Sequence, residues 1–116
     1  MFRGLLLVFS ASLLGAQQPS AFDLVVYGGT AGGAITAVSG ARMHLKVVLL
    51  EPRTHIGGMV SGGLSHTDVG NRDVIGGYSL EFFRRAGAYY RLSQYLQEIA
   101  WYVEPKVAEI LFRKML

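Results

Sequence analysis

Residues 23–51 read DLVVYGGTAGGAITAVSGARMHLKVVLLE, and this stretch decides the fold class. The apolar run at residues 21–27 stops abruptly at glycine, which is typical of a fully buried parallel strand. Small residues over 32–41 predict a helix that lies very close to a sheet. A second apolar run, over residues 45–50, predicts another strand and ends at Glu51. Strand, glycine turn, helix and strand together predict a βαβ unit of about 30 residues.

The turn GGTAGG, residues 28–33, has the composition of a dinucleotide site. We expect Gly28 to allow the tight turn out of the strand and Gly33 to allow close packing of the helix. The N–H groups of the first helical turn, with the positive end of the helix dipole, would then face a pyrophosphate. Glu51 follows Gly28 by 23 residues, near the spacing of about 20 typical of an acid that binds an adenosine ribose. Thr30 replaces the middle glycine of the G-x-G-x-x-G pattern, so its side chain must point away from the phosphates or hydrogen-bond to them.

Two other nucleotide sites do not fit this turn. A P-loop requires lysine and then serine or threonine after its last glycine, whereas Gly33 is followed by Ala34 and Ile35. A site for a 2′-phosphorylated dinucleotide is disfavoured because the Glu51 carboxylate would repel that phosphate.

A second glycine pair follows the acid and separates flavin sites from nicotinamide sites. Residues 55–61 read HIGGMVS, which fits the Arg-x-Gly-Gly-Arg-x-x-Ser/Thr frame of many flavoproteins, with His55 and Met59 in place of the arginines. Glycine at Gly57 and Gly58 would let the backbone approach the phosphates and ribityl chain of the cofactor without a Cβ clash. Nicotinamide dehydrogenases need no such pair, so the frame favours flavin.

From residue 23 onward the chain resembles the FAD-dependent oxidoreductases. The motifs that carry the resemblance are GGTAGG at 28–33, EPR at 51–53, HIGGM at 55–59, GGL at 62–64, TDVG at 67–70 and EPKVAE at 104–109. The resemblance implies FAD as cofactor and hydride transfer between an organic substrate and the flavin. The residues that we expect to bind the cofactor are Gly28, Gly29, Thr30, Ala31, Gly32, Gly33, Glu51, Pro52, Arg53, Gly57, Gly58 and Met59.

Two helices are predicted in the last third of the chain. Ser79 is expected to cap a helix that begins at Leu80, and Gly87 to mark a close contact of that helix. Its expected core stripe consists of Phe82, Phe83, Ala86, Tyr89 and Tyr90. A second helix is expected to start near Glu104 and Pro105, since proline suits the first turn. Its expected buried residues are Val107, Ile110, Leu111 and Met115.

The amino terminus has the layout of a secretory signal peptide. One cation, an apolar stretch over residues 4–16 and small residues at its end predict a signal peptide at 1–16 and a linker at 17–22. The stretch is shorter than the roughly 20 residues that a spanning helix needs, so stable membrane insertion is not expected. We therefore expect an exported protein, periplasmic or secreted.

The composition excludes several classes of function. The chain has no cysteine, which excludes a disulfide scaffold and a thiol nucleophile. Its net charge of +3 comes from scattered residues without a basic run, so a nucleic-acid partner is not expected. His55, His66 and Asp68 match no standard metal-ligand spacing, so no metal site is expected. No catalytic acid or base can be identified from the sequence.

The sequence thus predicts an incomplete α/β fold: a Rossmann-like FAD/NAD(P)-binding domain with one βαβ unit and two carboxy-terminal helices. With 116 residues, we expect 23–116 to be the truncated amino-terminal part of such a domain, with the carboxy-terminal part of the same enzyme as its missing partner. The expected function is that of an FAD-dependent oxidoreductase, with hydride transfer between the flavin and an unknown organic substrate, a small molecule or a saccharide-like compound. Two alternatives stay open at this point: a fragment of an NAD-dependent dehydrogenase, and a non-catalytic exported binding module.

Overall fold

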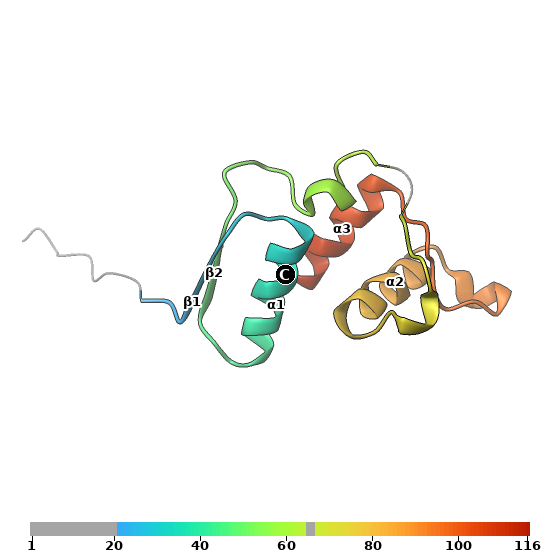
Figure 1. Ribbon diagram of the computed structural model, residues 1–116, viewed down its shortest axis with the longest axis horizontal. Coiled ribbons are helices and arrows are strands. Elements are labelled where there is room, and N and C mark those ends of the chain that lie inside the picture. Colours follow the sequence, from blue (N-terminus) through green and yellow to red (C-terminus); the bar gives the residue numbers. More distant parts are fainter. Residues whose placement is uncertain (1–20, 65–66) are drawn as a thin grey trace, which may run out of the picture.

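The computed structural model describes residues 21–64 and 67–116. The predicted signal peptide, 1–16, and most of the predicted linker lie outside the described residues. The regular elements are strand β1 (Leu24–Tyr27), helix α1 (Ala31–Arg42), strand β2 (Val47–Leu50), helix α2 (Gly77–Tyr89) and helix α3 (Pro105–Met115). Short 3-10 turns are η1 (Gly58–Val60), η2 (Arg72–Val74) and η3 (Leu92–Tyr95). This order, shown in Figure 1, confirms the α/β class and the βαβ unit with two later helices.

The βαβ unit is built around a close contact between α1 and the two strands. β1 and β2 are parallel, in a register that pairs Leu24 with Val47 and Tyr27 with Leu50. A Cβ built on Gly40 would lie 2.7 Å from Leu24 Cδ2 and 3.0 Å from Val47 Cγ2. The predicted close approach of helix and sheet is therefore confirmed, and Gly40 is the residue that makes it possible.

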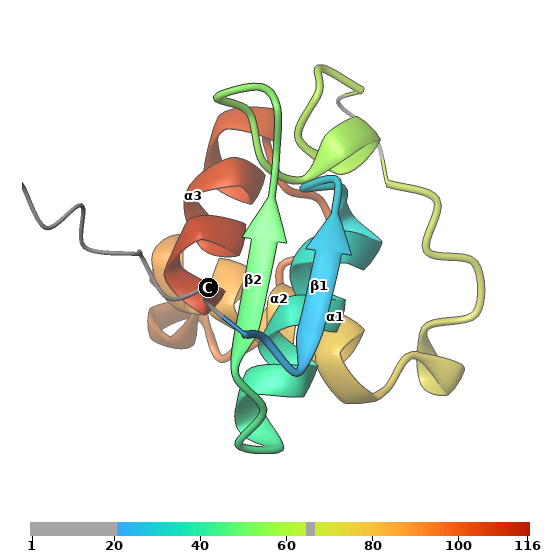
Figure 2. The ribbon, with the colours of Figure 1, turned by 90° about the vertical axis from the view of Figure 1, so that its left-hand side faces the viewer.

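The prediction of a fully buried first strand is wrong. Within β1, Val26 is buried, whereas Val25 is 57% and Tyr27 78% exposed. Figure 2 shows the reason: the two strands face the viewer and all three helices lie behind them. Because the helices cover only one face of the sheet, alternate side chains of the strand point away from the core.

The core lies between the three helices. Phe82 of α2 stacks on Phe112 of α3, with ring centroids 4.8 Å apart. Ala34 and Val38 bring α1 into the same cluster. Of the predicted α2 stripe, Phe82, Phe83 and Ala86 are buried and Tyr89 is exposed. Of the predicted α3 residues, Val107, Leu111 and Met115 are buried and Ile110 is half-buried.

The start of α2 differs from the prediction. The helix is capped by Gly76, and the Leu80 N–H already donates to the Gly76 carbonyl at 3.2 Å. Ser79 is therefore inside the first turn and is not the cap. Gly77 has a φ of 56°, a conformation that favours glycine, and this lets the chain enter the helix upstream of Ser79.

Two contacts fix α2 against its neighbours. A Cβ on Gly87 would lie 2.1 Å from the Glu98 carbonyl oxygen, which confirms the predicted close contact at this glycine. Glu81 accepts hydrogen bonds from Arg42 of α1, at 2.7 and 2.8 Å, and from Arg85. These guanidinium groups lower the Glu81 pKa to about 2.

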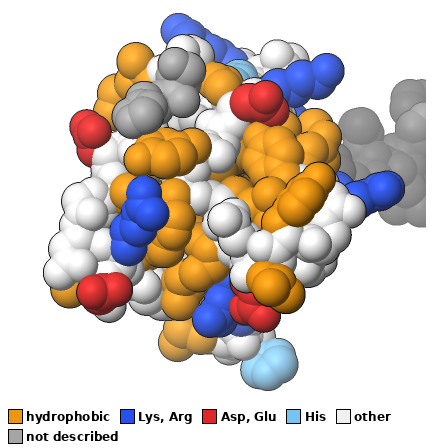
Figure 3. Space-filling view, turned by 90° about the vertical axis from the view of Figure 1, so that its right-hand side faces the viewer, with side chains coloured by type: hydrophobic (Ala, Val, Ile, Leu, Met, Phe, Trp, Pro, Cys, Tyr) orange, Lys and Arg blue, Asp and Glu red, His pale blue; other side chains and the backbone are white. Residues whose placement is uncertain are grey.

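The outer face of the helical layer carries no continuous charged surface among the described residues. Figure 3 shows single Lys, Arg, Asp and Glu side chains scattered among apolar ones. The helices that the structure describes are each too short or too polar to span a lipid bilayer.

Candidate cofactor site

The turn between β1 and α1 is closed by backbone contacts that only glycine permits. Gly28 has a φ of 105°, in the region that favours glycine, and its N–H donates to the Leu50 carbonyl at 2.8 Å. A Cβ on Gly33 would lie 2.0 Å from the Gly28 carbonyl oxygen. The first turn of α1 therefore sits directly against the end of β1, as the glycine pattern predicts.

Thr30 occupies the position of the missing glycine and caps α1. Its Oγ1 accepts the Gly33 N–H at 3.1 Å. The Thr30 hydroxyl is thus bonded to the helix backbone. Ala31 and Gly32 form the rest of the first turn, where N–H groups have no carbonyl partner inside the helix. These groups and the helix dipole favour an anion at this end of α1.

Glu51 joins the end of β2 to the turn after β1. Its Oε2 accepts the Gly29 N–H at 2.5 Å, and its Oε1 accepts the Arg53 N–H at 2.9 Å. These two backbone donors, chiefly that of Gly29, hold the Glu51 pKa below its usual value. The side chain is therefore an ionised acceptor at neutral pH, and a carboxylate oxygen has lone pairs left for the hydroxyl groups of a ribose.

The second glycine pair lies against the first turn. The Gly57 N–H donates to the Gly29 carbonyl at 2.7 Å. Gly57 and Gly58 have φ values of 110° and 57°, and a Cβ on Gly58 would lie 3.3 Å from the Thr30 Cα. Two motifs almost 30 residues apart are thus brought into backbone contact, which is what one shared cofactor would require.

These segments surround one open cavity of about 550 Å³. Of the predicted site residues, those that line it are Gly29, Thr30, Glu51, Arg53, Gly58 and Met59. Gly28, Gly33, Pro52 and Gly57 do not line it. Ala31 and Gly32 face an adjoining apolar cavity of about 290 Å³.

Sequence reasoning missed three residues of the cavity wall. His55, Gly62 and Leu64 line the cavity beside the predicted residues. All three belong to the motifs HIGGM and GGL that carry the resemblance. Including every residue of these motifs in the predicted site would have found them. His66 lies outside the described residues. Among the residues described, no group of three His, Cys, Asp or Glu side chains could hold a metal ion.

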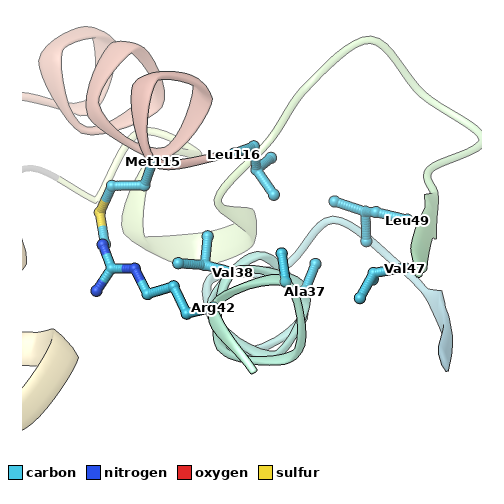
Figure 4. Close-up of a pocket in the computed structure, with 8 residues that line it drawn as sticks. Ala37, Val38, Arg42, Val47, Leu49, Met115 and Leu116 are labelled. Atoms are coloured by element: carbon cyan, nitrogen blue, oxygen red, sulfur yellow. The ribbon is translucent and has the colours of Figure 1, made fainter. Parts of the chain in front are cut away.

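A second hollow of similar size, about 540 Å³, lies between α1, β2 and the end of α3 and is of a different kind. Figure 4 shows Val38, Val47, Leu49 and Met115 around it, with Arg42 at one side. Its walls are almost entirely aliphatic side chains, without a helix start or an ordered carboxylate. It lacks the groups that bind phosphate and ribose, so the cavity at Glu51 is the candidate site.

The fold and the site together define a dinucleotide-binding α/β unit. Three features of the site fit the ADP part of FAD. They are a helix N-terminus reached through a glycine turn, an ionised acid at the end of the next strand, and a second glycine pair beside the turn and the acid. Comparison with known families matches residues 23–116 to FAD dependent oxidoreductase. The chain therefore belongs to the FAD-dependent oxidoreductases, and its cofactor is FAD. Searches of curated proteins and of solved structures gave no match.

Proposed function

We propose that this chain binds the ADP half of FAD in the cavity at Glu51, for hydride transfer between a small organic substrate and the flavin. The observation that carries the proposal is that the turn after β1, the residues after β2 and the second glycine pair meet around one cavity. They line it through Gly29 and Thr30, through Glu51 and Arg53, and through Gly58 and Met59. When bound, FAD supplies the hydride chemistry at its flavin ring. The chain's own residues bind and orient the cofactor.

Each segment has a distinct binding task in this proposal. The pyrophosphate lies where the cavity at Glu51 meets the start of α1, at Thr30, because the N–H groups and dipole of that helix end favour negative charge. The Glu51 carboxylate accepts hydrogen bonds from the adenosine ribose. Gly58 and Met59 border the cavity next to Thr30 and would follow the cofactor toward its flavin half.

We also propose that the unit works within a larger enzyme, whose further strands and helices cover the open side of the sheet. Val25, Tyr27 and Leu50 are exposed large apolar side chains on β1 and β2. Parallel sheets are ordinarily covered on both faces, since their strands are apolar on both sides. The aliphatic hollow in Figure 4 is a second surface suited to such a covering layer.

A cofactor titration of the 116-residue chain tests both parts of this proposal. We expect weak binding of FAD. Flavin fluorescence and amide NMR shifts at Gly29, Thr30 and Gly58 would measure it. ADP should displace FAD and FMN should not, because the site holds the ADP half. No shift with either FAD or ADP would overturn the proposed site. Tight stoichiometric binding would instead overturn the idea that a larger enzyme completes it.

Export is a separate proposal that rests on the apolar leader at residues 1–16. Expressed in a host with a secretory pathway, the protein should lose this leader, and its mature form should begin at Gln17. Amino-terminal sequencing of the purified protein measures this. A mature protein that still begins at Met1 and stays inside the cell would contradict it.

A further inference from the structure

A cluster of polar side chains ties α3 to the segment that carries the second glycine pair. Glu109 of α3 places Oε2 3.0 Å from His55 Nδ1. On the other side of the ring, His55 Nε2 lies 3.0 Å from Ser61 Oγ. The imidazole therefore bridges a carboxylate on α3 and a hydroxyl just beyond the glycine pair.

The other Glu109 oxygen holds the same segment through its backbone. Oε1 accepts the Ile56 N–H at 3.3 Å and two hydrogen bonds from Arg113, at 3.1 and 2.7 Å. Arg113 also donates to the Thr54 carbonyl. The Arg113 guanidinium lowers the Glu109 pKa, so the carboxylate is ionised and accepts at both oxygens. Residues 54–56 are thus fastened to α3 at three consecutive positions.

This cluster has the composition of a hydrolytic triad, but its geometry does not allow nucleophilic attack. Ser61 is only 5% exposed, and its hydroxyl lies 2.6 Å from the Ile56 carbonyl, to which it donates. A Cβ on Gly57 would lie 2.2 Å from Ser61 Oγ, so the hydroxyl is packed directly beneath the glycine pair. The cluster therefore stabilises the conformation of the loop at residues 54–61.

We infer that Glu109 is a positioning residue for the cofactor: through His55 and Ile56 it holds the Gly57–Gly58 pair against the phosphate turn. The inference rests on the proposed function. Glu109 does not line the cavity, whereas His55 does, so its effect would pass through the loop. A free glycine pair has many backbone conformations, and fixing it before binding removes that entropic cost from cofactor binding.

Glu109→Gln removes the second oxygen acceptor while keeping the size of the side chain. One amide oxygen cannot serve both His55 and the Arg113 and Ile56 donors, and the amide NH2 group would face one of them donor to donor. We expect amide exchange at Gly57 and Gly58 to speed up in the cofactor-free chain, and FAD affinity to fall about fivefold. The 15N signals of the His55 ring should also change, since Nδ1 then loses its carboxylate partner.

Glu81→Gln is the matched control. Glu81 is a helix carboxylate of similar side-chain exposure, 28% against 25% for Glu109. It pairs with Arg42 and Arg85, whereas Glu109 pairs with His55 and Arg113. The partners of Glu81 lie on α1 and α2, away from the loop. We expect Glu81→Gln to leave loop exchange, His55 signals and FAD affinity within twofold of the parent chain.

The outcomes separate this inference from the proposed function. Unchanged exchange at Gly57 and Gly58 in Glu109→Gln, or equal changes in Glu81→Gln, would overturn the positioning role even if FAD binds. Absence of FAD binding in the parent chain would overturn the proposed function, while the exchange and His55 readouts still decide the role of Glu109. If Glu109→Gln fails to fold, Glu109→Asp replaces it, because the shorter side chain draws the carboxylate away from His55 and the Ile56 N–H. The same faster exchange is expected, and unchanged exchange at Gly57 and Gly58 would overturn the inference.

Discussion

Gly33→Ala should destabilise the chain by about 2 kcal/mol, whereas Gly32→Ala should stabilise it by about 0.5 kcal/mol. The added methyl at Gly33 would lie 2.0 Å from the Gly28 carbonyl oxygen, a backbone atom that can move away only if the whole turn shifts. At Gly32 the nearest atom to such a methyl is Thr30 Oγ1, 3.9 Å away, so only the gain in helix propensity is left. Urea unfolding of both variants and the parent chain measures the difference.

The two neighbouring glycines make this a stringent test of the turn. Both substitutions add one methyl group within the same helical turn. A difference between the two variants in unfolding free energy therefore reflects the surroundings of each methyl group. If both variants unfolded at the same urea concentration, α1 would not sit against the end of β1 as described. The Gly33 variant should also lose FAD binding, because a displaced turn moves its N–H groups away from the pyrophosphate.

The sequence predicted which segments form the site, but it did not predict the contacts between those segments. The turn at Gly28, the close packing at Gly33 and the place of Glu51 after β2 follow from spacing, because a strand that ends in a tight turn leaves few ways to reach a helix start. The length of the chain between the two glycine pairs does not reveal that the Gly57 N–H bonds to the Gly29 carbonyl. That contact depends on tertiary packing against α3.

Two features of the fold were beyond the sequence for a similar reason. An apolar run such as LVVY predicts burial, but which face is covered depends on where distant helices dock, and here all three lie on one side. In the sequence, Glu109 is the last residue of the EPKVAE motif and has no assigned role. Only the folded chain shows that it faces His55, 54 positions earlier in the sequence.

Glu51→Gln should weaken FAD and ADP binding at neutral pH by at least about tenfold, the scale of one lost charge-assisted hydrogen bond. Glutamine has a single oxygen acceptor, so it cannot accept the N–H groups of both Gly29 and Arg53 as the two carboxylate oxygens do. The variant therefore either loses the hydrogen bond between residue 51 and the Gly29 N–H, or places the glutamine NH2 group against a backbone N–H donor. Fluorescence titration at pH 7 measures the affinity, with the exposed Glu98→Gln as a control expected to bind like the parent chain.

The pH dependence of the same variant tests whether the charge is responsible. The folded-state pKa of Glu51 lies below its ordinary value of 4.5, so its stabilising contribution is present above that value and is lost as the pH falls through the lowered pKa. The difference in unfolding free energy between the parent chain and Glu51→Gln should therefore be constant from about pH 6 to 8 and should shrink below about pH 4.5. Comparing the two chains cancels the titration of Glu81 and Glu109, which both share. A difference that persists unchanged in acid would mean that shape, and not charge, is what Glu51 contributes to the turn.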